Sequence, residues 1–321
     1  MRRRTLSAQT LDRTDRASMS PNRLKFRTAT YRDVANDLDR AVAWLESLGF
    51  PVAPTRVGDY HRHLNGIADA LDNGTLESLL QKEGTQDLIN SLFECTELRQ
   101  IYQLLEPIAD PELAARLGSF IKGPTAYRDE RSSSSSNRAR NIGFELSLGA
   151  QLLNSGISVE FHPDGDLRFH HDGYEVFIEC KRPQVEHQVN SRVKDALRQL
   201  ETRYRKAADP AKARGLVAVS ATKIINPFGN YYRTASRATL DAGLSGALQK
   251  FIDDHGRKWQ SPSDPRTLGC IVEFRAFVFV ESENIPTTGG DLAMTERRNL
   301  DPEAQSLVAS LAELFQRGIR P

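Results

Sequence analysis

Apolar residues recur every three or four positions through much of the first 125 residues, a spacing that predicts amphipathic helices. The clearest stripe lies within residues 30–49 and consists of Val34, Leu38, Val42, Leu45 and Leu48. Gly49 is placed to end this helix, and Asp110 followed by Pro111 is a typical helix start. Further helices are expected at about residues 61–72, 75–83, 86–94, 96–106 and 111–121. Residues 25–127 should therefore form an α-helical module.

The pattern changes in the second half of the chain. Residues 157–161 alternate apolar and polar side chains as a short strand does, and residues 216–222 and 268–280 are nearly continuous apolar runs. Such runs are typical of central strands that are covered on both faces. Helical spacing recurs at about residues 139–154, 190–207, 235–256 and 301–317, whereas Gly289, Gly290 and Asp291 indicate a loop. This order of elements predicts an α/β domain at residues 139–321.

A β-hairpin is predicted around Asp172 and Gly173, because both central positions of a type I′ turn need a positive φ. Counting outward from the turn gives the pairs His171 with Tyr174, Phe169 with Val176, Leu167 with Ile178, and Asp166 with Glu179. Directly opposed residues have Cβ atoms roughly 4.5–5.5 Å apart. Asp166 and Glu179 should therefore meet on one face of the sheet, and Lys181 should project from that face two residues further on.

Two neighbouring carboxylates repel each other unless positive charge lies between them. Mg²⁺ suits such a position, since it is held by one or two carboxylates together with substrate phosphate oxygens. The amine of Lys181 can orient a water molecule or stabilise developing negative charge. Asp164 is the alternative strand ligand, because the same register places it opposite Lys181. Cys180 should point to the other face as a small buried apolar side chain.

Asp166, a hairpin turn and then Glu179-Cys180-Lys181 resemble the motif of the PD-(D/E)XK nuclease superfamily, which has the restriction-endonuclease-like fold. The resemblance covers about residues 138–225. Glu145 matches the acidic residue that this family commonly carries on the helix before the hairpin. In one departure from the motif, the Pro-Asp pair of this chain lies at residues 163–164 and not at the Asp166 position.

The resemblance implies a nuclease that uses Mg²⁺ or Mn²⁺ to hydrolyse phosphodiester bonds, with DNA as the expected substrate and internal cleavage as the expected mode. Asp166 and Glu179 would hold the metal together with the backbone carbonyl of Cys180. Lys181 would activate the attacking water, and Glu145 would help to place the metal or the water. Such free-standing nucleases often serve restriction or antiviral defence, a role that the resemblance permits.

The helix expected at residues 190–207 has a basic face opposite its apolar stripe, formed by Arg192, Lys194, Arg198, Arg203, Arg205 and Lys206. Such a face is most often only solvated, but next to an acidic metal site it suits a phosphate backbone. The substrate contacts expected from this region are Arg182, Arg192, Lys194, Arg198 and, by resemblance alone, Gln199.

The composition adds few constraints. The net charge is +1, so nucleic-acid binding would depend on local clusters of basic residues. Three widely spaced cysteines argue against a disulfide framework and for a reducing, cytoplasmic location. Arg2, Arg3 and Arg4 are followed by no apolar run, so we expect neither a secretory signal nor a membrane span. Residues 1–24 are expected to be a loose or disordered basic arm, and residues 128–138 a Ser/Arg-rich linker between domains.

Two other classes of function remain open from the sequence. The chain could be a nucleic-acid-binding protein that does not cleave, built on the same fold. It could also be a protein-interaction or sensor protein, in which the helical module binds a partner or a second copy of the chain. A zinc site is less favoured than a magnesium site, because the neighbouring His170 and His171 on one strand point to opposite faces.

Overall fold

A computed structural model describes residues 31–130, 137–162, 166–283 and 285–318. The arm expected at residues 1–24, most of the linker expected at residues 128–138, and Asp164 lie outside these residues. Within the described part of the chain, the fold is α/β, with one mixed sheet of seven strands flanked by helices. None of the described helices has the length and apolar character needed to cross a bilayer.

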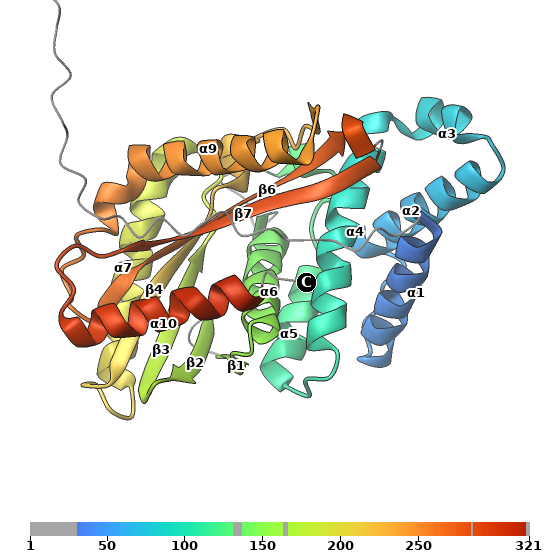
Figure 1. The fold of residues 1–321 in the computed structure, drawn as a ribbon. Helices are drawn as coiled ribbons and strands as arrows, with labels where there is room; N and C mark the ends of the chain where they lie inside the picture. The colour runs from blue at the N-terminus through green and yellow to red at the C-terminus, as the bar shows by residue number, and fades with distance from the viewer. Residues whose placement is uncertain (1–30, 131–136, 163–165, 284, 319–321) are drawn as a thin grey trace, which may run out of the picture.

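Helices α1 to α5 lie together at one end of the molecule (Figure 1). Their bounds are Tyr31–Ser47 for α1, Arg56–Asp72 for α2, Leu76–Glu83 for α3, Thr85–Leu105 for α4 and Pro111–Phe120 for α5. The predicted start of α5 is confirmed, because the Asp110 side chain accepts a hydrogen bond from the backbone N–H of Glu112 at 2.8 Å. The prediction of two helices at residues 86–94 and 96–106 is wrong. They are one helix, α4, since neither glycine nor proline interrupts residues 85–105.

The rest of the chain contains all seven strands of the sheet and five further α-helices within the described residues. They are α6 (Arg138–Asn154), β1 (Val159–Phe161), β2 (Leu167–His171), β3 (Tyr174–Lys181), α7 (Val189–Lys206), β4 (Ala213–Ser220), α8 (Thr222–Ile225), β5 (Tyr232–Thr234), α9 (Arg237–His255), β6 (Thr267–Val280), β7 (Ile285–Glu296) and α10 (Pro302–Gly318). Strands β1, β2 and β3 are antiparallel, whereas β3, β4 and β6 run parallel to one another. Strand β1 confirms the short strand predicted at residues 157–161, whereas β5 was not predicted and α8 begins at the end of the strand predicted at residues 216–222.

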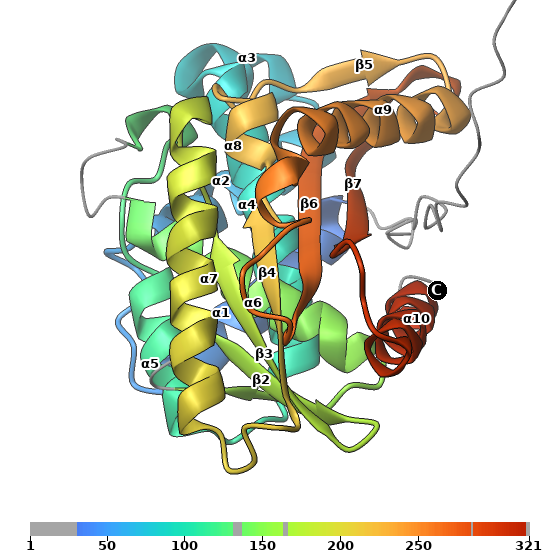
Figure 2. The same ribbon diagram turned by 90° about the vertical axis from the view of Figure 1, so that its left-hand side faces the viewer.

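The sheet is covered on both faces, as its apolar strands predict. In β4, Leu216 and Ala218 join the buried cluster that contains α6 and α10, whereas Val217 and Val219 join the cluster that contains α7 and α9. Successive side chains of a strand point to opposite faces, so these two clusters are the two sides of one sheet. Figure 1 shows α9 and α10 on opposite sides of β6 and β7, and Figure 2 shows α7 across the sheet from α10.

The predicted hairpin register is confirmed for every pair from Leu167–Ile178 to His171–Tyr174. Asp172 and Gly173 have φ values of 48° and 77°, as a type I′ turn requires. The turn therefore fixes which side chains of β2 and β3 share a face.

The prediction of a loop at residues 289–291 is wrong. Gly289, Gly290 and Asp291 lie inside β7, which pairs antiparallel with β6. Packing explains the first glycine. A Cβ at Gly289 would lie 2.9 Å from Leu244 Cδ1 and 3.4 Å from Leu240 Cδ1, so the absence of a side chain lets α9 pack close to the strand.

Packing continues across the boundary predicted at residues 128–138. Leu38, Leu98 and Leu117 of the N-terminal helices belong to the same buried cluster as Ile142 of α6 and Leu167 of β2. Helix α6 contacts both α4 and α5, and nearly its whole circumference is buried, where the sequence predicted a single buried stripe. The domain boundary stays a prediction from composition, whereas the hydrophobic core is shared by the two segments.

Candidate active site

The hairpin brings the predicted acid pair and lysine together at the carboxyl end of β3. Asp166 immediately precedes β2, and its Oδ2 accepts a hydrogen bond from the backbone N–H of Cys180 at 2.5 Å. Lys181 Nζ lies 3.5 Å from Glu179 Oε2 and 3.7 Å from Asp166 Oδ2. Lys181 therefore forms ion pairs with both carboxylates.

Glu145 reaches the same site from α6. Its side chain is buried and forms an ion pair with Arg116 of α5, and Arg116 Nη2 also donates a hydrogen bond to the carbonyl of His162 at 2.8 Å. Burial, followed by the negative charge of Asp166, raises the pKa of Glu145 to about 8 despite the opposing effect of Arg116. Glu145 is only 9% exposed.

Glu179 is the most deeply buried of the acids, at 2% exposure. Burial raises its pKa, and the charge of Asp166 adds to this effect, while Lys181 and Arg203 oppose it. Arg203 Nε donates a hydrogen bond to Glu179 Oε1 at 3.1 Å. Arg203 thus does not belong to the solvated basic face predicted for α7. It lies three positions after the buried Leu200 and one before the buried Tyr204, so it flanks the apolar stripe.

An open cleft of about 560 Å³ lies in front of the site. Among the proposed catalytic residues, Glu145, Asp166 and Lys181 line it, and so does Cys180, whereas Glu179 is buried and is not among the described residues that line it. Four of the five predicted substrate contacts also line it, namely Arg182, Arg192, Arg198 and Gln199. Lys194 is exposed on α7 and is not among the described residues that line the cleft.

Four polar residues of the cleft were not predicted: Asn137, Asn141, Gln184 and Asp195. Helical spacing could have predicted three of them from residues already assigned to the site. Asn137 and Asn141 precede Glu145 at intervals of four residues, so the three share one face of α6 and its N-terminal flank. Asp195 lies three positions after Arg192 and three before Arg198, on the face of α7 that borders the cleft.

Arg182 differs from a simple phosphate contact. Its guanidinium donates two hydrogen bonds to the carboxylate of Glu130, at 2.7 and 2.9 Å, and the side chains of Arg182 and Glu130 are 5% and 0% exposed. Lys223 Nζ lies 3.7 Å from the same carboxylate and 3.9 Å from the centre of the Tyr127 ring. Burial lowers the pKa of Lys223 to about 8. These partners come from distant parts of the sequence, and no local pattern marks them.

The donor set suits a hard divalent cation, but its members are already partnered. Carboxylates and a backbone carbonyl are the ligands that Mg²⁺ prefers. Burial, followed by the negative charge of Asp166, raises the pKa values of Glu145 and Glu179, and a bound cation would favour the charged form of both carboxylates. Nevertheless, no group of three His, Cys, Asp or Glu side chains among the described residues is arranged to hold one metal ion. Arg116 and Arg203 occupy part of the space around Glu145 and Glu179.

The histidines support no metal site in the described part of the chain. His61 contacts Asp39 at 2.6 Å, His63 contacts the hydroxyl of Ser91 at 2.7 Å, and His171 contacts the hydroxyl of Ser310 at 2.7 Å. These contacts are structural: His61 and His63 lie on α2, and His171 lies on β2.

Comparison with known proteins adds no further constraint. The chain matches no protein-family model, no curated protein and no solved structure.

Proposed function

We propose that this chain is a divalent-metal-dependent nuclease whose α/β core is arranged like that of the PD-(D/E)XK superfamily. The observation that carries the proposal is the contact of Lys181 with both Asp166 and Glu179 at the end of a hairpin, beside a cleft lined by arginines. Perturbed carboxylates in a cleft are typical of catalytic sites, and the neighbouring arginines supply the charge that a phosphodiester backbone requires.

Each residue has a definite role in this proposal. Asp166, Glu145 and Cys180 line the cleft, and the carboxylates of Asp166, Glu145 and Glu179 together with the carbonyl of Cys180 would hold Mg²⁺ or Mn²⁺. When bound, such an ion lowers the pKa of its water ligand and neutralises the charge of the phosphate in the transition state. Lys181 orients the attacking water, because its amine lies within 3.7 Å of two of the acids.

The arginines that line the cleft have two different proposed roles. Arg192 and Arg198 are exposed on α7 and line the cleft, so they are available to bind phosphate oxygens. Arg182 is held by Glu130, so it contributes fixed positive charge at the wall of the cleft. We propose DNA as the substrate by resemblance to the family, and a role in restriction or antiviral defence on the same ground alone.

Lys181→Ala tests the proposal directly. The purified full chain would be incubated with plasmid, linear duplex DNA, single-stranded DNA and RNA in the presence of Mg²⁺, Mn²⁺ or EDTA. We expect metal-dependent cleavage that falls by about a hundredfold or more in the variant, the lower range for loss of a positioned acid–base group. Lys250→Ala is the matched control, because Lys250 is exposed on α9 and pairs with Asp254 one helical turn away. Cleavage by Lys181→Ala at the rate of the unmodified chain would remove the assignment.

One observation favours the alternative of a nucleic-acid-binding protein that does not cleave. Arg116 and Arg203 already form ion pairs with Glu145 and Glu179, as they would in a site that had no need of a metal. This alternative predicts binding of nucleic acid in EDTA, without any product in Mg²⁺ or Mn²⁺.

A further inference from the structure

Aromatic side chains are exposed on one short segment that the proposed reaction does not use. In the described part of the chain, five large apolar side chains are exposed: Leu48, Leu71, Phe228, Tyr231 and Tyr232. Three of them fall within five positions, and Phe228 is the most exposed, at 67%. Because burial of a phenylalanine stabilises a fold, an aromatic cluster left in water is typical of a binding surface.

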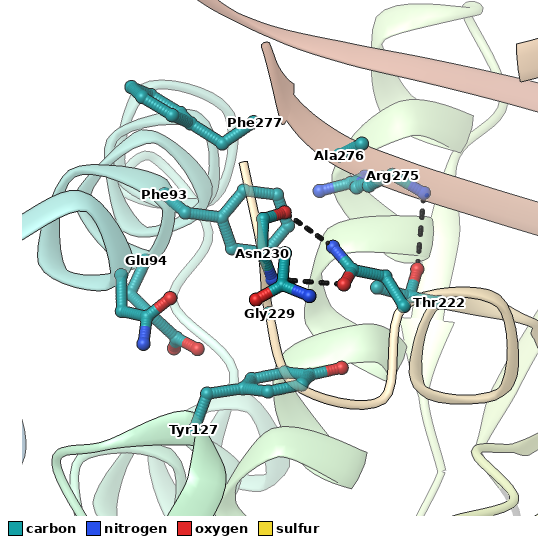
Figure 3. A pocket seen from close by; sticks show the side chains of 11 residues that line it. Phe93, Glu94, Tyr127, Thr222, Gly229, Asn230, Arg275, Ala276 and Phe277 are labelled. Atoms are coloured by element: carbon teal, nitrogen blue, oxygen red, sulfur yellow. Dashed lines mark hydrogen bonds between the residues drawn. The ribbon is translucent and has the colours of Figure 1, made fainter. Parts of the chain in front are cut away.

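The turn that presents Phe228 is firmly held. The Asn226 side chain donates a hydrogen bond to the carbonyl of Asn230 at 2.7 Å and accepts one from the backbone N–H of Asn230 at 2.9 Å. Gln86 of α4 donates another to the carbonyl of Gly229 at 2.7 Å. Figure 3 shows Gly229 and Asn230 beside Tyr127, at the edge of a small cavity of about 20 Å³. The orientation of Phe228 toward solvent is therefore built into the fold.

The aromatic segment lies at the same edge of the sheet as the cleft. Strands β3 and β4 are parallel, with Lys181 paired to Val219, so both strands end at this edge. The chain then passes through α8 into residues 226–232. A Cβ at Gly229 would lie 3.0 Å from the Tyr127 ring, and the guanidinium of Arg182 lies 5.5 Å from the centre of the same ring. Tyr127 therefore lies between Gly229, in the turn that presents Phe228, and Arg182, which lines the cleft.

Aromatic rings combined with a basic cleft match the chemistry of a nucleic-acid strand with unpaired bases. Basic residues along a groove bind the backbone, and exposed rings stack on successive bases without regard to sequence. In a duplex the base faces are already stacked on each other, so rings at a protein surface can reach them only where the strand is open. Arg192 and Arg198 supply the phosphate contacts here, and Phe228, Tyr231 and Tyr232 supply the rings.

We propose that Phe228, assisted by Tyr231 and Tyr232, stacks on unpaired bases of a strand that runs through the cleft. The substrate class is then single-stranded nucleic acid, or a duplex with a single-stranded extension. The proposal rests on the proposed function of the cleft, and it adds which form of nucleic acid the cleft accepts.

Binding in EDTA separates this proposal from the cleavage chemistry. Fluorescence anisotropy of a labelled oligothymidine and of a blunt duplex of equal length would give the Kd of the full chain and of Phe228→Ala. We expect the Kd for the single strand to rise about tenfold in the variant, as for loss of one stacked base, and the Kd for the duplex to stay unchanged. Phe228→Trp should restore binding, and Leu48→Ala, which removes another exposed apolar side chain just after the end of α1, should have no effect.

The salt dependence of binding adds a second criterion. Stacking releases no counterions, so the slope of log Kd against log salt concentration should be the same for Phe228→Ala and the unmodified chain. Arg192→Ala should reduce that slope by about 0.7, the value for one phosphate contact to a single strand. Unchanged single-strand binding by Phe228→Ala would overturn the stacking proposal. It would not affect the proposal of a nuclease, which Lys181→Ala tests. Absence of nucleic-acid binding by the unmodified chain would overturn both, and loss of a dimer in Phe228→Ala during sedimentation would identify the rings as a self-association surface instead.

Discussion

Glu130→Gln is the substitution whose effect the structure defines best. Glu130 has a fully buried carboxylate that accepts two hydrogen bonds from Arg182 and lies 3.7 Å from Lys223 Nζ. Glutamine has the same size and can still accept a hydrogen bond from Arg182, so the change removes charge without opening a cavity. It leaves two buried cations without their shared anion.

The expected loss follows from the burial of this pair. Removing one partner of a buried ion pair typically costs about 3–5 kcal/mol, because the remaining charge cannot be solvated. Lys223 can release its proton, since burial already lowers its pKa to about 8, whereas Arg182 stays charged at any accessible pH. We therefore expect Glu130→Gln to lower the free energy of unfolding by about 3 kcal/mol at pH 7, the lower end of that range.

Urea denaturation followed by circular dichroism measures this loss, and the chain offers a matched control. Glu160 pairs with Arg168 at 2.5 Å, but its side chain is 51% exposed, so Glu160→Gln should cost no more than about 1 kcal/mol. If the two variants lose the same free energy, then water reaches the Glu130 carboxylate and the reasoning about a dry ion pair is wrong.

Two further predictions concern stability. Lys223 should make the free energy of unfolding rise between pH 8 and 10.5, because its folded pKa of about 8 lies below the unfolded value of 10.5 and the unfolded chain binds the extra proton. Lys223→Met should remove this rise of about 3 kcal/mol in urea denaturation across that pH range, and parallel curves for both proteins would contradict it. Gly289→Val should lower the free energy of unfolding by about 1–3 kcal/mol through overpacking against Leu244, although valine favours strands. Gly243→Ala on α9, where a Cβ has open space, should instead raise it by up to about 1 kcal/mol, and a loss for both variants would exclude the packing explanation.

The sequence predicted the parts of the site that local rules determine. Asp172 and Gly173 specify the turn, the turn specifies the register, and the two-residue period of a strand then places Asp166, Glu179 and Lys181. Helical spacing also predicted the bounds of α6 and α7 closely. These inferences needed no contact between distant parts of the chain.

The partners of the acidic residues could not be predicted in this way. Arg116 lies 29 positions from Glu145, and Glu130 lies 52 positions from Arg182, so their pairing depends on how α5 and residues 127–130 pack against the sheet. The same limit explains the error at Gly289. Paired glycines are typical of loops, and only the position of Leu244 on α9 shows why a strand requires one there.

The way in which the acids are paired links the N-terminal helices to the site. Arg116 belongs to α5 and Arg203 to α7, so Glu145 and Glu179 are held by arginines from different layers of the fold. A cation bound by these carboxylates would compete with both arginines, and metal affinity would therefore depend on how firmly α5 packs against α6. Under the proposed function, the helices before residue 127 accordingly contribute to the site itself. Through Arg116, and through the core that they share with the sheet, they set the charge at the proposed catalytic centre.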